Sequence, residues 1–102
     1  MKQPKIDFDE LHRAFESRVR LGIMSILAVN ERVDFNTLKE YLNVSDGNLA
    51  SHLKALEKEN FIHVNKLFIG RKPNTQYSMT REGKNALEKH LKSLEILINS
   101  HK

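Results

Sequence analysis

The residues best suited to chemistry in this sequence are short polar and basic side chains on one face of a predicted helix. The helix spans residues 45–60, and Leu49, Leu53 and Leu56 stack on its inner face at i, i+4 and i+7. A step of about 100° per residue places small or hydrogen-bonding residues on the opposite half, with His52 on its flank. These residues are Gly47, Asn48, Ser51, Lys54, Ala55 and Lys58.

Such side chains in the first two turns of a helix could read base edges in the major groove of DNA. Asn48 could bond adenine with two hydrogen bonds, and Ser51 could contact a base or a phosphate. His52 and Lys54 could reach a phosphate or the edge of the groove, and Gly47 would let the backbone approach closely. The alternative is an ordinary solvated helix face.

The segment after this helix favours the DNA interpretation. From Asn60 to Thr80 there is no Asp or Glu. The segment predicts a hairpin of strands 61–69 and 75–79 with a loop over residues 70–74, and its basic residues would neutralise phosphates or enter the minor groove. A β-turn with lysines for solubility is the alternative. The predicted DNA-binding residues are Ser45, Gly47, Asn48, Ser51, His52 and Lys54 on the helix, and Lys66, Arg71, Lys72 and Asn74 on wing 66–74.

Asp46 does not suit a DNA surface, because a carboxylate beside phosphates costs affinity. At the first helical position it complements the positive end of the helix dipole, and we expect it to point sideways from the groove.

The remaining elements must position this surface. An amphipathic pattern predicts a helix over residues 7–15, and Ser17 can cap a second helix to about Asn30. Asn36 is predicted to cap a short third helix that ends near Asn43, and Thr80 a last helix over residues 81–100. Residues expected to face inward are Leu38, Tyr41 and Leu42 on the third helix, with Val44 after it.

This order predicts a winged helix-turn-helix, a fold that is mainly α with a small β-hairpin. It has a three-helix core, a two-stranded wing, and flanking N- and C-terminal helices.

Length and composition set the outer limits. The chain has 102 residues, 39% hydrophobic and 29% charged, which predicts one folded domain over residues 1–102. The net charge of +4 favours an anionic partner. The absence of cysteine removes thiolate metal sites and agrees with a reducing cytoplasm.

Several function classes fit poorly. The stretch from Gly22 to Val29 is far short of the ~20 residues that cross a bilayer, and the first thirteen residues lack the apolar core of a secretory signal. We therefore expect a soluble protein without a membrane partner. No phosphate loop, paired carboxylates or catalytic triad order is present, so we expect no enzyme and no cofactor. His90 and His101 lie ~16 Å apart along a helix, too far to share a metal ion within one chain; a site completed across a dimer stays open.

The last helix carries more apolar residues than one face can bury. Leu87, Leu91, Leu94 and Ile98 form a stripe, Leu97 widens it, and Ile96 lies nearly opposite. We expect residues 81–100 to form a dimerisation helix, with the first helix joining the seam. The predicted interface residues are Phe8, Leu11, Phe15, Leu91, Leu94, Leu97 and Ile98. The alternative is a helix folded back over a single core.

Four strings of residues resemble the winged-helix regulators related to the MarR and ArsR groups. Arg18-Val-Arg-Leu-Gly-Ile-Met-Ser-Ile-Leu resembles their second helix and Phe35-Asn-Thr-Leu-Lys-Glu-Tyr-Leu their positioning helix. Ser45-Asp-Gly-Asn-Leu-Ala-Ser-His-Leu-Lys-Ala-Leu-Glu resembles their recognition helix, and Thr80-Arg-Glu-Gly the start of their helix after the wing.

The resemblance implies regulation of transcription through double-stranded operator DNA, with Asn48, Ser51 and His52 near the bases and Arg71 and Lys72 at the wing tip. Unlike the metal-sensing members, the chain has no Cys, and no effector ligand can be named. A winged-helix adaptor that binds another protein is the alternative function.

Overall fold

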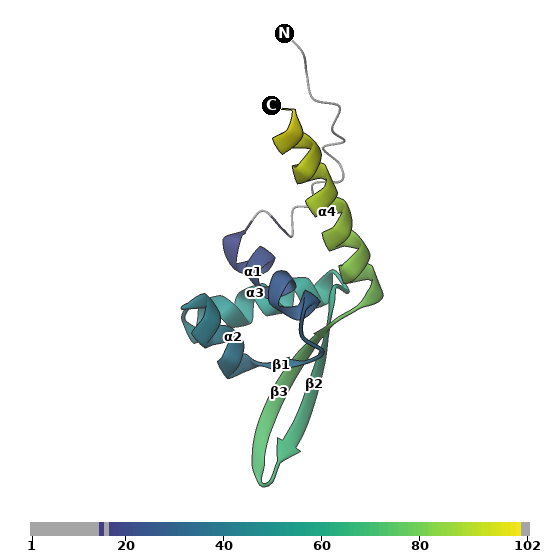
Figure 1. The fold of residues 1–102 in the computed structure, drawn as a ribbon. Helices are drawn as coiled ribbons and strands as arrows, with labels where there is room; N and C mark the ends of the chain where they lie inside the picture. The colour runs from purple at the N-terminus through teal and green to yellow at the C-terminus, as the bar shows by residue number, and fades with distance from the viewer. Residues whose placement is uncertain (1–14, 16, 101–102) are drawn as a thin grey trace.

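The computed structural model describes residue 15 and residues 17–100. It has a mainly helical winged helix fold, as predicted, with four helices and a three-stranded antiparallel sheet in the described residues (Figure 1). The elements follow in the order α1 (Arg18–Ala28), β1 (Val33–Asp34), α2 (Phe35–Leu42), α3 (Asp46–Lys58), β2 (Ile62–Ile69), β3 (Lys72–Met79) and α4 (Arg81–Asn99). The predicted helix over residues 7–15 lies outside the described residues, apart from Phe15.

Three of the four predicted helix caps are confirmed. The side-chain oxygens of Ser17, Ser45 and Thr80 accept hydrogen bonds from backbone N–H groups in the first turns of α1, α3 and α4. The Thr80 bond, from the N–H of Gly83, is the shortest at 2.8 Å. Each cap satisfies a donor that the helix itself leaves unpaired, so each helix begins where its Ser or Thr stands.

The start of α2 differs from the prediction. Its N-cap is Asp34 and not Asn36, because Asp34 Oδ1 accepts a 2.8 Å hydrogen bond from the N–H of Thr37. The helix ends at Asn43 in the left-handed conformation, as predicted (φ 53°). Tyr41, predicted to face inward, is 75% exposed. The helix is short and uses Leu38 and the half-buried Leu42 for packing, so Tyr41 one residue away falls outside the buried stripe.

The sheet has the strand order β1-β3-β2, and the two-residue strand β1 was not predicted. The wing turn is also tighter than the predicted loop over 70–74. Ile69 pairs with Lys72, leaving only Gly70 and Arg71 between the strands, and Gly70 has φ 64°. Glycine at the first central position suits a type II′ hairpin turn. Pro73 is tolerated within β3 because it lies beyond the residues that pair with β1, where β3 has a neighbour on one side only.

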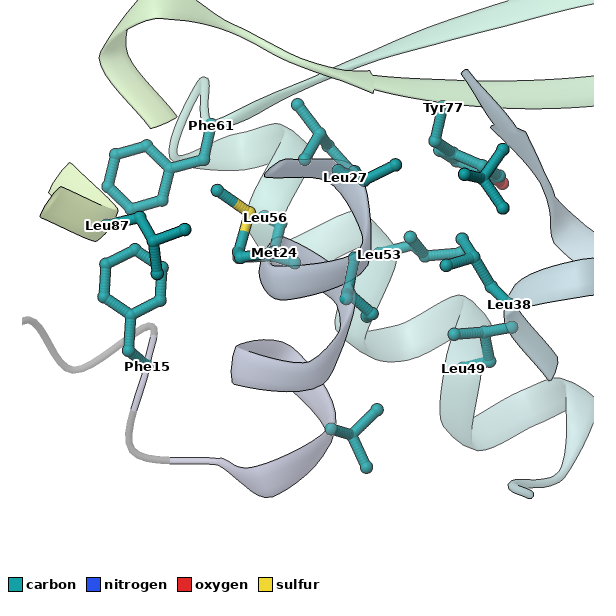
Figure 2. Close-up of a cluster of buried hydrophobic side chains, with 14 residues drawn as sticks. Phe15, Met24, Leu27, Leu38, Leu49, Leu53, Leu56, Phe61, Tyr77 and Leu87 are labelled. Atoms are coloured by element: carbon teal, nitrogen blue, oxygen red, sulfur yellow. The ribbon is translucent and has the colours of Figure 1, made fainter. Parts of the chain in front are cut away.

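The core lies between the helices and the base of the hairpin (Figure 2). Leucines of α2 and α3 pack against α1, and the five largest side chains that are fully buried are Ile23, Met24, Leu38, Leu49 and Leu56. Burying side chains of this size contributes roughly 1.5–3 kcal/mol each. The leucines expected to face inward on α2 and α3 therefore lie in the core: Leu38, Leu49, Leu53 and Leu56 are all buried.

Phe15, predicted at a dimer interface, belongs to this core instead. It is 3% exposed, and its ring stacks on Phe61 with the ring centroids 5.6 Å apart. The centroid of the His90 ring on α4 lies 5.0 Å from that of Phe15, so Phe15 packs between α4 and Phe61, the residue before β2, in its own chain. A side chain so enclosed has little surface left for a second copy.

The wing and α4 project from the core in opposite directions, with α3 between them (Figure 1). The first half of α4 packs on the core through Gly83, Leu87 and His90, while Leu91 and Ile98 are exposed. The first half of α4 therefore lies on the core and its second half extends beyond it (Figure 1).

Candidate nucleic-acid interface

The outward face of α3 is open along its length. Leu49, Leu53 and Leu56 are buried beneath it, whereas the residues predicted to contact DNA at its start are exposed. The exposed residues are Ser45, Gly47, Asn48, Ser51, Lys54 and Lys58, and Ala55 is half-buried. Ser45 also has a structural role, since its Oγ accepts from the N–H of Asn48 at 3.2 Å.

The carboxylate of Asp46 is paired with a cation. Lys39 Nζ of α2 lies 2.7 Å from Asp46 Oδ1, and both side chains are exposed. An exposed pair of this kind adds little to stability. Its consequence is electrostatic, because the negative charge at the start of α3 has a positive neighbour on the side of α2. Sequence reasoning placed Asp46 sideways from the groove but did not find Lys39.

His52 is tied to α1. Arg20 Nε donates a 3.0 Å hydrogen bond to Nδ1 of the half-buried His52 ring. Burial lowers the pKa of His52, and the nearby positive charge of Arg20 lowers it further. Only one ring nitrogen therefore remains available to DNA. Arg20 was not predicted as a functional residue, because its role depends on contact between two helices that are 32 residues apart at these positions.

The wing carries its cations along its length and at its tip. Lys66, Arg71 and Lys72 are all exposed. Lys66 faces Thr75 across the strand pair, Lys72 faces Ile69, and Arg71 is in the turn. Two apolar side chains near the tip were not predicted as functional: Phe68 is 72% exposed and Ile69 is 58% exposed. Their exposure beside the cations gives the wing an amphipathic end.

Asn74 does not lie at the wing tip. It pairs with Leu67 inside the hairpin, and its side chain is half-buried. An interaction with Asn74 helps to lower the pKa of Asp34, after the larger effect of hydrogen bonding to Thr37. The Asn74 Oδ1 atom is buried without a hydrogen-bond partner. This side chain therefore faces the cap of α2, and the predicted DNA contact through it has no structural support.

The predicted dimer residues fall into three groups. Phe8 and Leu11 lie outside the described residues, and Phe15 is in the core. On α4, Leu91 is 47% exposed and Ile98 63% exposed. Leu94 and Leu97 are half-buried.

In residue 15 and residues 17–100, no group of three or more His, Cys, Asp or Glu side chains is arranged to hold a metal ion. None of the helices described is both long and apolar enough to span a membrane.

A capped helix-turn-helix with a basic hairpin beside its second helix defines a winged helix DNA-binding protein. Residues 19–98 match the family model for the winged helix DNA-binding domain, and the chain belongs to this family. It is 38% identical over 79 residues to an uncharacterized protein of Methanocaldococcus jannaschii, across 78% of this chain and 86% of that protein.

Solved structures agree with the fold. The chain is similar to a transcriptional regulator homologue from Pyrococcus horikoshii OT3, with a TM-score of 0.77 and 28% identity over 92% of this chain and 98% of that one. It also resembles Bacillus subtilis PadR, which was solved in complex with operator DNA. That match has a TM-score of 0.62 and 20% identity, and covers 69% of this chain and 45% of PadR. The family and the fold are those of DNA-binding transcriptional regulators.

Proposed function

We propose that this protein is a sequence-specific regulator that binds double-stranded DNA as a homodimer. In each copy α3 enters the major groove, and the hairpin of β2 and β3 contacts phosphates or the adjacent minor groove. The observation that carries the proposal is the exposed face of α3 with Asn48, Ser51 and Lys54, together with the exposed cations of the wing that follows it in the chain. Asn74, which sequence reasoning also assigned to DNA, is half-buried near the cap of α2 and is left out of this proposal.

The two parts of this surface have different tasks. Asn48 and Ser51 can donate and accept hydrogen bonds, so they can distinguish base edges. Lys66, Arg71 and Lys72 carry only positive charge and donors, so they add affinity that depends on salt and little on sequence. A surface that combines the two is suited to locating DNA first and selecting a site afterwards.

The dimer is proposed through α4. Leu91 and Ile98 are exposed apolar residues seven positions apart, which places them on the same side of the helix. A second copy packed there would bury both side chains. A two-fold dimer would present two copies of α3, and we expect it to prefer inverted repeats.

The relatives support this function without defining the site. The P. horikoshii regulator homologue matches almost the whole of this chain, and PadR binds operator DNA with the same fold. A regulator of this kind acts where the genome is, so we propose a cytoplasmic location and no catalytic activity.

The test is DNA binding by two variants at several salt concentrations. Asn48→Ala should cost ~1–3 kcal/mol on a duplex selected from random sequences and little on unselected DNA, because it removes a base contact. Arg71→Ala with Lys72→Ala should weaken binding to both duplexes and reduce the slope of log K against log salt by about two.

The matched control is Lys84→Ala with Lys89→Ala, which removes the same charge from exposed positions on α4. Equal effects of the two double variants would show that only net charge matters. No affinity of the wild-type chain for any duplex at low salt would rule out the proposed function.

One observation favours a second candidate. Phe68 and Ile69 expose apolar surface near the wing tip, as expected for an adaptor that contacts another protein. In that case the wing double variant would leave nucleic-acid binding unchanged or absent, and would lose one specific protein partner.

A further inference from the structure

We propose that Arg20 and His52 together form a clamp for one backbone phosphate at the edge of the groove that α3 occupies. The inference rests on the proposed function, which it extends from α3 and the wing to α1. It assigns a binding site to a residue of α1, outside the helix-turn-helix and the wing.

The hydrogen bond between the two side chains determines which atoms remain free. Arg20 Nε donates to Nδ1 of His52 at 3.0 Å, so Nδ1 must carry a lone pair and no proton. A neutral imidazole then carries its proton on Nε2, which makes Nε2 a hydrogen-bond donor. The low pKa of His52, caused by burial and by Arg20, is consistent with this neutral form.

Arg20 keeps most of its binding capacity in this arrangement. The bond to His52 uses Nε, and the two terminal nitrogens still hold four of the five guanidinium donors. Among the residues that the structure describes, no carboxylate is within ion-pair distance of Arg20. Within this part of the chain the charge of Arg20 therefore has no paired carboxylate, and the bond to His52 restricts the side chain before any ligand arrives.

The position of the pair indicates which anion it binds. His52 stands four residues after Asn48, so the two lie on neighbouring turns of one face of α3. His52 is on the flank of that face, toward α1. When a helix lies in the major groove, its outward residues meet the bases and its flanks meet the phosphate backbones.

The chemistry of the pair also suits a phosphate. The terminal nitrogens of a guanidinium match the spacing of two phosphate oxygens, and the Nε2–H of His52 offers a further donor. Base edges, by contrast, carry no net charge to match that of Arg20. The clamp would therefore fix the register of α3 without reading the sequence.

The first experiment compares Arg20→Gln with Arg18→Gln. Glutamine at position 20 keeps a donor of similar reach but has no charge. Arg18 is exposed in the same turn of α1, and residues two apart on a helix point in different directions, so its replacement is a matched control.

Binding is measured on one fixed duplex across a salt series. Arg20→Gln should weaken binding by about fivefold to tenfold near 0.1 M salt and reduce the salt slope by about one, whereas Arg18→Gln should leave the slope unchanged. Thermal unfolding of both variants is recorded beside the titrations. An unchanged slope in a less stable Arg20→Gln would show that the pair only joins α1 to α3, and would overturn the clamp. Equal slopes for the two variants would overturn it as well.

A second measurement needs no variant. Nitrogen NMR of the wild-type His52 ring should show a proton on Nε2 and none on Nδ1, and the Nε2 resonance should shift when the duplex is added. A proton on Nδ1, or an Nε2 signal that DNA leaves unchanged, would contradict the clamp. If the wild-type chain binds the duplex and only these signatures fail, the proposed function stands and the clamp does not.

Discussion

Two side chains at the edges of α3 contact cationic side chains of the preceding helices. Asp46 would repel phosphates, and Lys39 of α2 lies 2.7 Å from its carboxylate. His52 would be free to take either tautomer, and Arg20 of α1 occupies its Nδ1. The residues between these edges, such as Asn48 and Ser51, are exposed for contact. Neighbouring helices thus determine the charge and the proton positions at the borders of the face.

At Gly47 we expect one substitution to have opposite effects on stability and on DNA binding. A Cβ added there would meet no atom within 4 Å, and alanine is favoured over glycine in a helix by up to ~1 kcal/mol. We expect Gly47→Ala to raise the free energy of unfolding while weakening DNA binding, because the new methyl group stands on the proposed contact face. Urea unfolding and duplex titration measure the two effects. A variant that is more stable and binds equally well would show that the backbone at Gly47 does not approach DNA.

Asp34 links the start of α2 to pH. Hydrogen bonds from Thr37 hold the pKa of Asp34 below its ordinary value of 3.8, so the folded chain favours the carboxylate. A group whose folded pKa is depressed adds stability above its unfolded pKa, and this stability is lost as pH falls through the folded pKa. We expect Asp34→Asn to keep the cap, because asparagine also caps helices. Its stability should fall less steeply than that of the wild type below about pH 4. Asp34→Ala should cost ~1 kcal/mol at neutral pH. Unfolding curves from pH 2 to pH 7 test both variants. If the stabilities of wild type and Asp34→Asn fell equally at acid pH, Asp34 would not be the group that links the start of α2 to pH.

At the scale of elements, the helices were predictable from local signals. Ser17, Ser45 and Thr80 each cap a helix, and Asn43 ends one, because these functions depend on residues within one turn. Strand β1 was not predictable, since two residues cannot show a periodic pattern and Val33 is in a strand only because Tyr77 pairs with it. The cap of α2 was misplaced for the same reason: Asp34 ends β1 and begins α2.

The candidate site shows the same difference between features set by local sequence and features set by contacts between elements. The exposed polar face of α3 follows from helical periodicity, and the basic wing follows from composition. Arg20 and Lys39 gain their significance from partners on another element, at His52 and Asp46, so no local pattern could reveal them. Asn74 was assigned to the tip because Gly70 and Pro73 both favour turns, whereas pairing with β2 continues β3 through Pro73 to Lys72.

The packing of α4 against Phe61, the residue before β2, depends on Gly83. A Cβ at this position would lie 2.1 Å from the carbonyl oxygen of Phe61, which also accepts a hydrogen bond from the N–H of Thr80. Backbone atoms cannot move aside as the end of a side chain can, so Gly83→Ala should displace the start of α4. The free energy of unfolding should fall by roughly 1–3 kcal/mol, the usual cost of overpacking. Gly47→Ala is the matched control, with the same chemical change in an open position. Thermal unfolding compares them, and equal stabilities would show that α4 shifts freely against Phe61.

At the scale of the whole molecule, the opposite directions of the wing and α4 separate the proposed DNA contact from the proposed dimer interface. The wing extends from one side of the core and the second half of α4 from the other (Figure 1). A partner bound to α4 would therefore leave the wing clear. The geometry of the dimer would then determine the distance between the two copies of α3.

The dimer prediction concerns the distance between the two copies of α3 and the residues of α4 that maintain it. Replacing Leu91 and Ile98 by Glu should give a folded monomer, because two charges would enter the proposed apolar seam. Ile96→Glu is the control: Ile96 is 37% exposed and lies nearly opposite the stripe. Sedimentation measures the mass of each variant.

DNA titration then measures what the dimer adds to binding. Wild type should prefer inverted half-sites centred about 34–36 Å apart, with a salt slope near −7 if ~8 phosphates are neutralised. The double variant should bind one half-site with about half that slope. A double variant that stays dimeric, or that prefers the inverted repeat as strongly as wild type does, would place the interface elsewhere. The buried residues of α4 are unchanged in the double variant, so we expect it to stay folded, and thermal unfolding checks this.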